Sequence, residues 1–386
     1  MKILTIDVGT GTQDIFLYDA RLDIENGFKL VVPSPTMIVH HKLKEATRQG
    51  QAVLLDGVLM GGGPSAWSAE AHIRAGLPLY ATPQAARSFN DDLQAIQEMG
   101  ILLVSEDEAQ RLPETVQRIT LADFDLNAIR QAFQPFGVSL DALDAVAVAV
   151  FDHGDAPPSY SDRQFRFDYL DGRIQQVNTL SAFAYLADDV PPIMTRLQAV
   201  VDSARRTAGS FFERTPLVVM DTAPAAVLGA TFDPLVAAQE RVLIANVGNF
   251  HTLAFRLGPA GIEAVFEHHT GLLDRARLDL LLLALADGSL RHTDVFDDHG
   301  HGALIYEPRP LVLDETSPFG VAVTGPRRSL MKDSRLRPYF ATPFGDMMLS
   351  GCFGLLAATA DLLPELAGSL HAALAGAGAS GVAPWD

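Results

Sequence analysis

The sequence predicts an α/β protein made of two related domains, and three observations carry this prediction. The chain has 386 residues, which is more than one ordinary core accommodates. A hairpin pattern occurs twice, at residues 2–18 and 241–257. Residues 143–150 form an almost unbroken apolar run, typical of a strand buried on both faces of a parallel sheet. We therefore expect domains over residues 1–230 and 231–386.

Each copy of the hairpin is an apolar run, a turn of small residues and a second apolar run. Laid together without gaps, Asp7-Val-Gly9 falls on Asn246-Val-Gly248. A hairpin tip of this kind can bring backbone N–H groups close to an anion. Two such tips predict a phosphate chain held from two sides, whereas two unrelated strand–turn–strand units are the alternative.

Strand and helix patterns alternate between the two copies. Residues 29–41 read as a strand pair. Residues 52–60 form an apolar run that ends in Gly61-Gly62-Gly63-Pro64, and a helical pattern follows directly. A strand, a glycine turn and a helix in this order place a helix N-terminus beside a ligand. Further on we expect a short strand at 101–104 between two mainly helical segments, 83–99 and 109–132.

The strand at 143–150 ends at Asp152-His153-Gly154, and ligands of open α/β sheets lie at the carboxyl ends of such strands. A strand at 217–220 leads into the alanine-rich segment 221–229. The remaining expectations are helices at 193–207, 274–286 and about 350–362, a strand at 319–324, and a frayed tail from residue 372.

The composition excludes several classes of partner. With 29 basic and 47 acidic residues the net charge is −18, which argues against binding a nucleic-acid backbone or an anionic membrane. A phosphate ligand would depend on Mg²⁺ and backbone N–H groups instead. We expect neither a signal peptide nor a membrane span. The single cysteine, Cys352, rules out an internal disulfide and indicates a reducing compartment, so we expect a cytoplasmic protein.

Four segments resemble, in order, motifs of the actin-like ATPase superfamily of sugar kinases, acetate kinases, heat-shock chaperones and actin. They resemble a first phosphate loop, an interdomain connector, a second phosphate loop and a glycine turn that supports adenosine, at residues 7–12, 221–229, 246–252 and 347–354. The resemblance implies a duplicated, ribonuclease H-like fold of two lobes with a nucleotide cleft between them. It also implies insertions in the first lobe, a C-terminal helix that can return to it, and ATP and Mg²⁺ as cofactors.

Within that superfamily the chain resembles an uncharacterised family labelled as a pyruvate formate-lyase activating protein. The matching residues lie at 60–64, 152–154, 266–270, 298–302 and 324–328. The radical enzymes that activate pyruvate formate-lyase need an iron–sulfur motif of three cysteines, and this chain has one cysteine. We therefore do not expect a radical activase.

Asp7 is the first candidate for both catalysis and metal binding. A carboxylate beside a phosphate loop can hold Mg²⁺ directly or through water, although capping of the turn is an alternative. The resemblance implies that the following residues contact the nucleotide: Gly9, Thr10, Gly11, Thr12, Gln13, Asn246, Gly248, Asn249, Thr252, Gly351 and Gly354.

Asn246 departs from the superfamily, which usually has Asp at this position, and an Asn side chain cannot take up a proton. Slow hydrolysis, a base supplied elsewhere and nucleotide binding alone all stay open. Asp152 and His153 are candidates for that base, because they follow a strand similar to the sugar-kinase strand that ends near the substrate. Bonding of both side chains to loop amides is the alternative.

A second group of acidic and histidine side chains follows the second hairpin: Glu267, His268, His269, Asp297, Asp298, His299 and His301. Adjacent histidines on a strand point to opposite faces, and the spacing matches no established zinc pattern. A substrate or partner pocket, loop capping and a metal site therefore stay open. Candidates for substrate binding are Gly61, Gly62, Gly63, His268, His269, His299, His301, Arg327 and Arg328, the two arginines as an anion clamp and Arg163 and Arg166 as weaker examples.

Three functions stay open on the sequence. The first is ATP-dependent phosphoryl transfer to a small acceptor or to water, as an ATPase or small-molecule kinase. The second is a nucleotide-dependent switch that activates a partner enzyme with little or no hydrolysis. The third is a small-molecule or metal-binding protein on a degenerate actin-like fold. The expected partners are a nucleotide and an unknown small molecule or enzyme, and a homodimer stays open.

Overall fold

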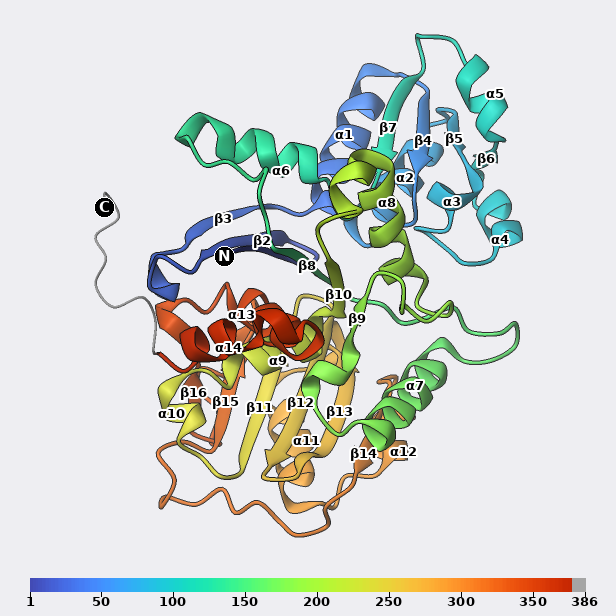
Figure 1. Cartoon of the computed structure of the whole chain (residues 1–386). Helices are drawn as coiled ribbons and strands as arrows, with labels where there is room; N and C mark the ends of the chain where they lie inside the picture. The colour runs from blue at the N-terminus through green and yellow to red at the C-terminus, as the bar shows by residue number, and fades with distance from the viewer. Residues whose placement is uncertain (377–386) are drawn as a thin grey trace.

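The computed structural model describes residues 1–376, which form two six-stranded sheets and one four-stranded sheet with helices packed around them (Figure 1). The chain is thus a mixed α/β protein, as predicted. The last part of the predicted second domain and most of the predicted frayed tail, residues 377–386, lie outside the described residues.

The first six-stranded sheet is built on the first predicted hairpin. Its strands, in spatial order, are β3 (Phe28–Pro33), β2 (Thr12–Asp19), β1 (Lys2–Val8), β8 (Ala145–Val150), β10 (Leu217–Asp221) and β9 (Ala184–Leu186). The first three strands pair antiparallel, and β8 and β10 then continue parallel to β1. Every residue of β8 is fully buried, which explains its continuous apolar run.

The second six-stranded sheet repeats this arrangement. In spatial order it contains β14 (Gly302–Ile305), β13 (Gly261–His269), β12 (His251–Gly258), β11 (Val242–Val247), β15 (Val321–Thr324) and β16 (Pro338–Phe340). The run from β13 to β16 has the same strand directions as the run from β3 to β10. The predicted hairpin repeat is therefore confirmed, and it extends over five strands of each sheet, as the resemblance to the actin-like ATPase superfamily implies.

The third sheet is inserted between β3 and β8 and lies at the upper right of Figure 1. Its four parallel strands, in spatial order, are β6 (Leu102–Leu103), β5 (Leu79–Ala81), β4 (Val53–Gly57) and β7 (Gln117–Leu121). Its helices are α1 (Pro35–Gln49), α2 (Pro64–Arg74), α3 (Pro83–Ala86), α4 (Leu93–Glu98) and α5 (Glu106–Arg111).

Two local predictions in this region are wrong. Residues 29–41 are one strand followed by a helix, because Ser34 accepts a hydrogen bond from the Met37 N–H and Pro35 occupies the first helical position. The segment 109–132, predicted as helix, is interrupted by β7, whose pairing with β4 outweighs the local helical pattern.

Two helices, α9 (Thr222–Ala230) and α13 (Ser350–Leu362), cross in the middle of the molecule. A Cβ added to Gly229 would overlap the Ser350 carbonyl, and one added to Gly354 would overlap the Ala225 carbonyl. The two backbones therefore approach as closely as glycine allows. Although α13 lies near the C-terminus in sequence, it packs in the core of the first sheet, against β1 and β8.

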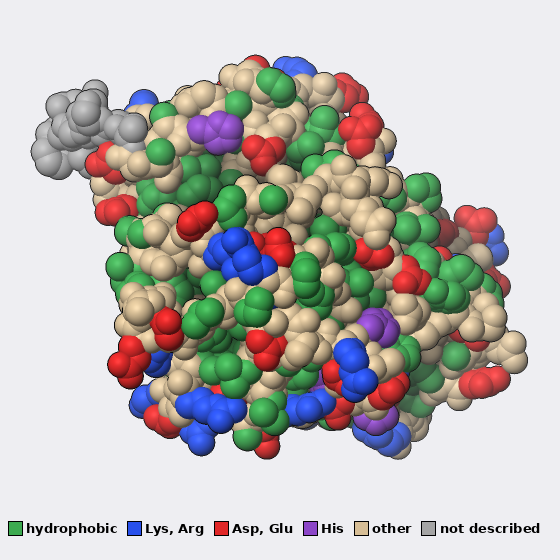
Figure 2. Space-filling model, turned by 90° about the horizontal axis from the view of Figure 1, so that it is seen from below, with side chains coloured by type: hydrophobic (Ala, Val, Ile, Leu, Met, Phe, Trp, Pro, Cys, Tyr) green, Lys and Arg blue, Asp and Glu red, His purple; other side chains and the backbone are tan. Residues whose placement is uncertain are grey.

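The other helices pack against the sheets or against other helices (Figure 1). They are α6 (Leu126–Phe133), α7 (Asp162–Gln176), α8 (Thr195–Phe212), α10 (Pro234–Ala237), α11 (Arg275–Asp287), α12 (His292–Phe296) and α14 (Pro364–Leu374). Among the described residues, no helix combines the length and apolarity that crossing a bilayer requires. On the face seen from below, basic and acidic side chains are interspersed and no large patch of one charge forms (Figure 2).

Candidate functional site

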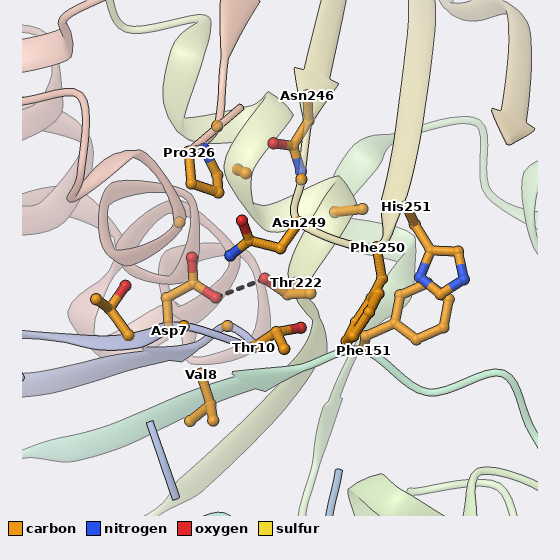
Figure 3. Close-up of a pocket in the computed structure, with 18 of the residues that line it drawn as sticks. Asp7, Val8, Thr10, Phe151, Thr222, Asn246, Asn249, Phe250, His251 and Pro326 are labelled. Carbon is orange, nitrogen blue, oxygen red and sulfur yellow. Dashed lines mark hydrogen bonds between the residues drawn. The ribbon is translucent and has the colours of Figure 1, made fainter. Parts of the chain in front are cut away.

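A cavity of about 1100 Å³, open solvent included, lies between the tips of the two repeated hairpins (Figure 3). Residues of the first tip, of the second tip, of the glycine turn of the third sheet and of the first turns of α9 and α13 all line it. It lies at the carboxyl ends of β1, β11 and β15, where ligands of open α/β sheets bind.

The two hairpin tips are closed in the same way. The Gly9 N–H donates to the Thr12 carbonyl at 2.9 Å, and the Gly248 N–H donates to the His251 carbonyl at the same distance. A Cβ on Gly248 would stand 2.6 Å from that carbonyl, so the second turn needs a glycine there. The tips face each other closely, since a Cβ on Gly11 would stand 3.2 Å from Nδ2 of Asn249.

Asp7 lies at the end of β1, where the first hairpin meets both crossing helices. Thr222 of α9 donates a hydrogen bond of 2.5 Å from its hydroxyl to Oδ1 of Asp7 (Figure 3). Gly351, in the first turn of α13, leaves the room that the other carboxylate oxygen occupies. Burial raises the pKa of Asp7 to about 6; the Thr222 hydrogen bond lowers it and the negative charge of Asp221 raises it further.

Asp14 is the direct cross-strand partner of Asp7 in the first hairpin and also lines the cavity. Directly opposed residues of an antiparallel pair share one face of the sheet. Burial, followed by the negative charge of Asp7, raises the pKa of Asp14 to about 8, and its Oδ1 atom is buried without a hydrogen-bond partner. Both carboxyl groups therefore resist ionisation near neutral pH, Asp14 more than Asp7.

The second tip presents an amide and aromatic rings to the same cavity. Asn246 and Asn249 both line it, and Phe250 lies beside His251 at the end of the tip (Figure 3). Gly325, at the end of β15 with a φ of +95°, lies against Asn246, where a Cβ would stand 2.5 Å from Oδ1. The end of β15 therefore lies directly against the end of β11 at the base of the second tip.

The predicted glycine turn of the third sheet, Gly61 to Gly63, lines the cavity from the opposite side. Gly63 meets the ring of Phe250, and Trp67 of α2 lies edge-on to that ring with centroids 5.9 Å apart. Arg196 lines the cavity next to Gly61 and is held by the Asp123 carboxylate through hydrogen bonds of 2.7 and 3.0 Å. The inserted sheet thus contacts both hairpin tips.

Three predicted nucleotide contacts do not line this cavity. Gln13 donates from its side chain to the Pro33 carbonyl at 3.1 Å on the neighbouring strand. Thr252 is fully buried, with its hydroxyl 2.8 Å from that of Thr270. Gly354 lies one turn further along α13 than Gly351 and forms the close contact with α9. The other predicted contacts do line it, namely Gly9, Thr10, Gly11, Thr12, Asn246, Gly248, Asn249 and Gly351.

Asp152 and His153, the predicted base candidates, also lie outside the lining. The Asp152 carboxylate is 1% exposed and accepts hydrogen bonds of 2.9 Å from the backbone N–H groups of Gly154, Arg196 and Leu197. It thereby holds the loop after β8 onto the first turn of α8. The ring of His153 faces Asp91 at 3.4 Å, and this interaction is the main cause of its raised pKa.

The predicted histidine group divides in two. His269 and His301 lie together with His251, which sequence reasoning did not place in the group. His268 is fully buried on the other side of β13, with Nδ1 3.2 Å from the His269 carbonyl oxygen. His299 is exposed in the loop after α12 and has a φ of +64°.

The arginine candidates bond mainly to protein groups. Arg166 is fully buried, pairs with Asp221 and Glu267, and donates to the Asp152 carbonyl at 2.9 Å. Arg163 donates to the Phe296 and Gly300 carbonyls. Arg327 is exposed and Arg328 half-buried, and both follow the cavity-lining end of β15 without lining the cavity themselves.

Sequence reasoning missed Asp14, Arg196 and His251 in the cavity. Asp14 could have been found from the sequence. The length of the turn fixes the register of the hairpin, and this register places Asp14 opposite Asp7. His251 could have been found by aligning it with Thr12 in the hairpin repeat. Arg196 carries no such signal, since its position depends on the folding of the inserted sheet.

The residues present fit the Mg²⁺ and nucleotide that the resemblance implies. Asp7 and Asp14 are two buried carboxyl groups with raised pKa values, and among the described residues one of their oxygens has no hydrogen-bond partner. Carboxylate oxygens are the ligands that Mg²⁺ prefers, and turns rich in glycine let backbone N–H groups approach phosphates.

Solved structures with some likeness to the chain include a "ROK family transcriptional regulator, homolog of E.coli MLC protein", a "ROK Hexokinase from Thermus thermophilus" and a "diol dehydratase-reactivating factor in nucleotide free form". The regulator is 10% identical with a TM-score of 0.27, over 68% of this chain and 37% of its own. The hexokinase is 12% identical with a TM-score of 0.23, over 68% and 47%. The reactivating factor is 12% identical with a TM-score of 0.28, over 92% and 99%. At such scores these likenesses carry no weight for function.

The chain spans less than half the length of the first two of these structures. No curated protein matches the chain. A family described as "Putative pyruvate format-lyase activating enzyme (DUF1786)" matches residues 60–330, which is more than half of the chain and includes both the glycine turn and the second hairpin. The resemblance to this family is thus confirmed, and the chain belongs to it.

Proposed function

We propose that the protein binds Mg²⁺·ATP between the two hairpin tips and transfers the terminal phosphoryl group to a small acceptor or to water. The two six-stranded sheets would act as two lobes, over residues 1–230 and 231–386 with helix α13 near the C-terminus returning to the first, that close on the nucleotide. One observation carries this proposal: two hairpin tips closed by the same backbone hydrogen bond line one cavity, and two carboxylates lie at the base of the first tip.

The first tip would bind the phosphate end. Asp7 and Asp14 would hold Mg²⁺, which when bound neutralises charge on the phosphate oxygens. Thr10 and Thr12 would donate from their hydroxyl groups, and the tip amides from the backbone. Catalysis of this kind consists of positioning and electrostatic stabilisation.

The end of β15 and the segment before α13 would hold the other end of the nucleotide. Gly325 and Pro326 line the cavity there, together with the apolar side chains of Met347 and Met348. A flat, largely apolar base suits such a surface, because methionine side chains adapt to irregular shapes and to aromatic rings. The triphosphate would then cross the space between the tips.

Isothermal titration of the purified protein with Mg²⁺·ATP tests this proposal. The wild type should bind, and Asp14→Asn should weaken binding at least tenfold because one Mg²⁺ ligand loses its charge. Asp333→Asn, an exposed acidic position outside the cavity, is the matched control and should bind like the wild type. Absence of binding at millimolar nucleotide, or binding unchanged in Asp14→Asn, would contradict the proposal.

A second candidate function, a nucleotide switch that acts on a partner enzyme, is favoured by Asn246. This residue takes the place of Asp7 in the second copy, and its neutral amide packs against Gly325 where a carboxylate could serve as a base. Phosphate release under saturating Mg²⁺·ATP separates the two candidates. Turnover supports the transferase, whereas tight binding with protection of the chain from limited proteolysis and no turnover supports the switch.

A further inference from the structure

Three histidines lie side by side at one edge of the second sheet. His251 is the first residue of β12 and pairs directly with His269, the last residue of β13. His301 directly precedes Gly302 of β14, which pairs with Glu267 of β13, and its N–H donates to the Glu267 carbonyl at 2.9 Å. Neighbouring ends of three strands therefore bring together side chains that are far apart in the sequence.

The three imidazole rings form a compact triangle. Their centroids are 4.7 Å apart for His269 and His301, and 5.1 Å apart for each of the other two pairs. One ring nitrogen from each lies within 4.8 Å of the other two. Nitrogen ligands at 2.0–2.1 Å from one tetrahedral ion are about 3.3 Å apart, so small rotations of the side chains suffice to bind it.

A buried carboxylate stands behind this triangle. Glu267 is fully buried; its Oε2 accepts from Arg166 at 3.1 Å, while its Oε1 has no hydrogen-bond partner in the part of the chain that the structure describes. That free oxygen faces Nδ1 of His301 at 3.7 Å, a nitrogen that is also buried without a partner. Histidine ligands of metals commonly donate their second ring nitrogen to a carboxylate, which fixes the orientation of the ring.

The surroundings of the three rings leave negative charge that a cation can offset. Arg166 offsets only one of the two carboxylates it contacts, Asp221 and Glu267. A cation at the three rings would be attracted by the one negative charge that this pairing leaves.

We propose that His251, His269 and His301 bind a divalent transition-metal ion, with Zn²⁺ as the ion that best matches three imidazole ligands, and that the fourth coordination position is open to the cavity. Sites with three protein ligands and one open position are typical of catalytic zinc. His251 lines the cavity and stacks on Phe151, with the centroids 4.1 Å apart (Figure 3). The ion thus stands at the end of the cavity beside the second tip.

The open position would bind a water molecule or an oxygen ligand of a small substrate, such as a hydroxyl or carboxylate group. This site is separate from the two carboxylates of the first tip, whose oxygen ligands suit Mg²⁺ rather than a transition metal. The inference does not rest on the proposed function, because the three rings bind an ion without any nucleotide.

Titration with Co²⁺ tests the proposal on untagged protein that has been stripped of metal with a chelator and then dialysed. One equivalent should bind and give the visible absorption of four- or five-coordinate Co²⁺, and Zn²⁺ should displace it. His269→Gln and His301→Gln should each weaken binding at least 100-fold. Glu267→Gln should weaken it about 10- to 100-fold, because a carboxylate that orients a ligand has effects of this size.

His299→Asn is the matched control, since His299 is an exposed neighbour outside the triangle and Asn tolerates its positive φ. It should bind Co²⁺ like the wild type. Less than half an equivalent bound to the wild type, or binding that survives both ligand changes, would overturn the proposal. His269 is less buried than His301, so its replacement is less damaging to the fold. If His301→Gln does not fold, His269→Gln with a normal melting curve therefore decides the outcome.

Discussion

Gly351 and Asp7 are packed so closely that a Cβ on the glycine would overlap Oδ2 of the carboxylate. The first turn of α13 and the Asp7 carboxylate, which are far apart in the sequence, are therefore in direct contact. This contact fixes the position of Asp7 against the first turn of α13.

Gly351→Ala should therefore displace Asp7 and weaken Mg²⁺·ATP binding by at least tenfold. Isothermal titration measures this effect, and thermal unfolding shows whether the fold survives. Gly368→Ala is the matched control, because Gly368 lies in α14 and no described residue has an atom within 4 Å of the place of a Cβ. Alanine there should raise stability by about 0.5–1 kcal/mol and leave binding unchanged. Equal nucleotide affinity in both variants would contradict this view of the contact.

The acidic pair predicts a pH dependence of stability. The folded-state pKa of Asp14, about 8, lies above its ordinary value of 3.8, so the folded protein binds more protons than the unfolded chain between these values. The contribution of Asp14 to the free energy of unfolding should therefore be highest near pH 4 and should fall as the pH rises towards 8. Asp7, with a pKa of about 6, contributes in the same direction up to that pH.

Asp14→Asn should remove most of this fall. At pH 8 without metal its Tm should exceed that of the wild type by about 1–2 °C for each kcal/mol gained, since the shift falls as chain length rises. The two Tm values should converge at pH 4, where the wild-type carboxyl is protonated. Calorimetry across pH 4–8 measures both trends, and a wild-type Tm above that of Asp14→Asn at pH 8 would refute the predicted charge penalty.

At the crossing of α9 and α13, we expect Gly229 to tolerate no larger residue. Gly229→Ala would place a Cβ onto the Ser350 carbonyl and should lower stability by about 3 kcal/mol or prevent folding, because backbone in a close-packed core moves only at a high cost. Gly172→Ala in α7, with open space around it, is the control and should melt at or above the wild-type temperature. Denaturant unfolding of both variants is the measurement.

Trp67 offers a direct optical signal for ligand binding. Its ring, 55% exposed, lies edge-on to Phe250 at the tip that lines the cavity. Mg²⁺·ATP that engages this tip should change the tryptophan emission, and Trp67→Phe should abolish the change. Trp385→Phe removes the other tryptophan of the chain and should preserve it. A titration with no fluorescence change in a protein that binds by calorimetry would show that the tip does not respond to the ligand.

The hairpin repeat was the most informative feature of the sequence, because hairpin register is fixed by turn length. The pairing of Asp7 with Asp14 in the first copy corresponds to that of Asn246 with Leu253 in the second. The inserted third sheet was harder to predict, since its strands are short and Ser34 and Pro35 mark a helix start within an apolar segment. Local patterns determine where elements begin, but not which strands pair.

The site was predictable only in part. Asp7 and most tip residues that line the cavity follow from the motif. Asp152 accepts hydrogen bonds from backbone amides of the loop after β8 and of the first turn of α8, which was the alternative to a role as a base. The histidine triangle joins residues from three strands, and no spacing in the sequence signals it. Such a group becomes visible only when the order of the strands is known.

The duplication of the hairpin has a consequence for the orientation in which a ligand can bind. Two identical tips would present a phosphate chain with equivalent ends, and a ligand could enter either way round. Here the first copy carries Asp7 and Asp14, while the matching positions of the second carry Asn246 and Leu253, all of them lining the cavity. Only one end of the near-symmetric cavity therefore attracts a hard cation through carboxylates, so divergence between the copies sets a single polarity for any cation-bearing ligand.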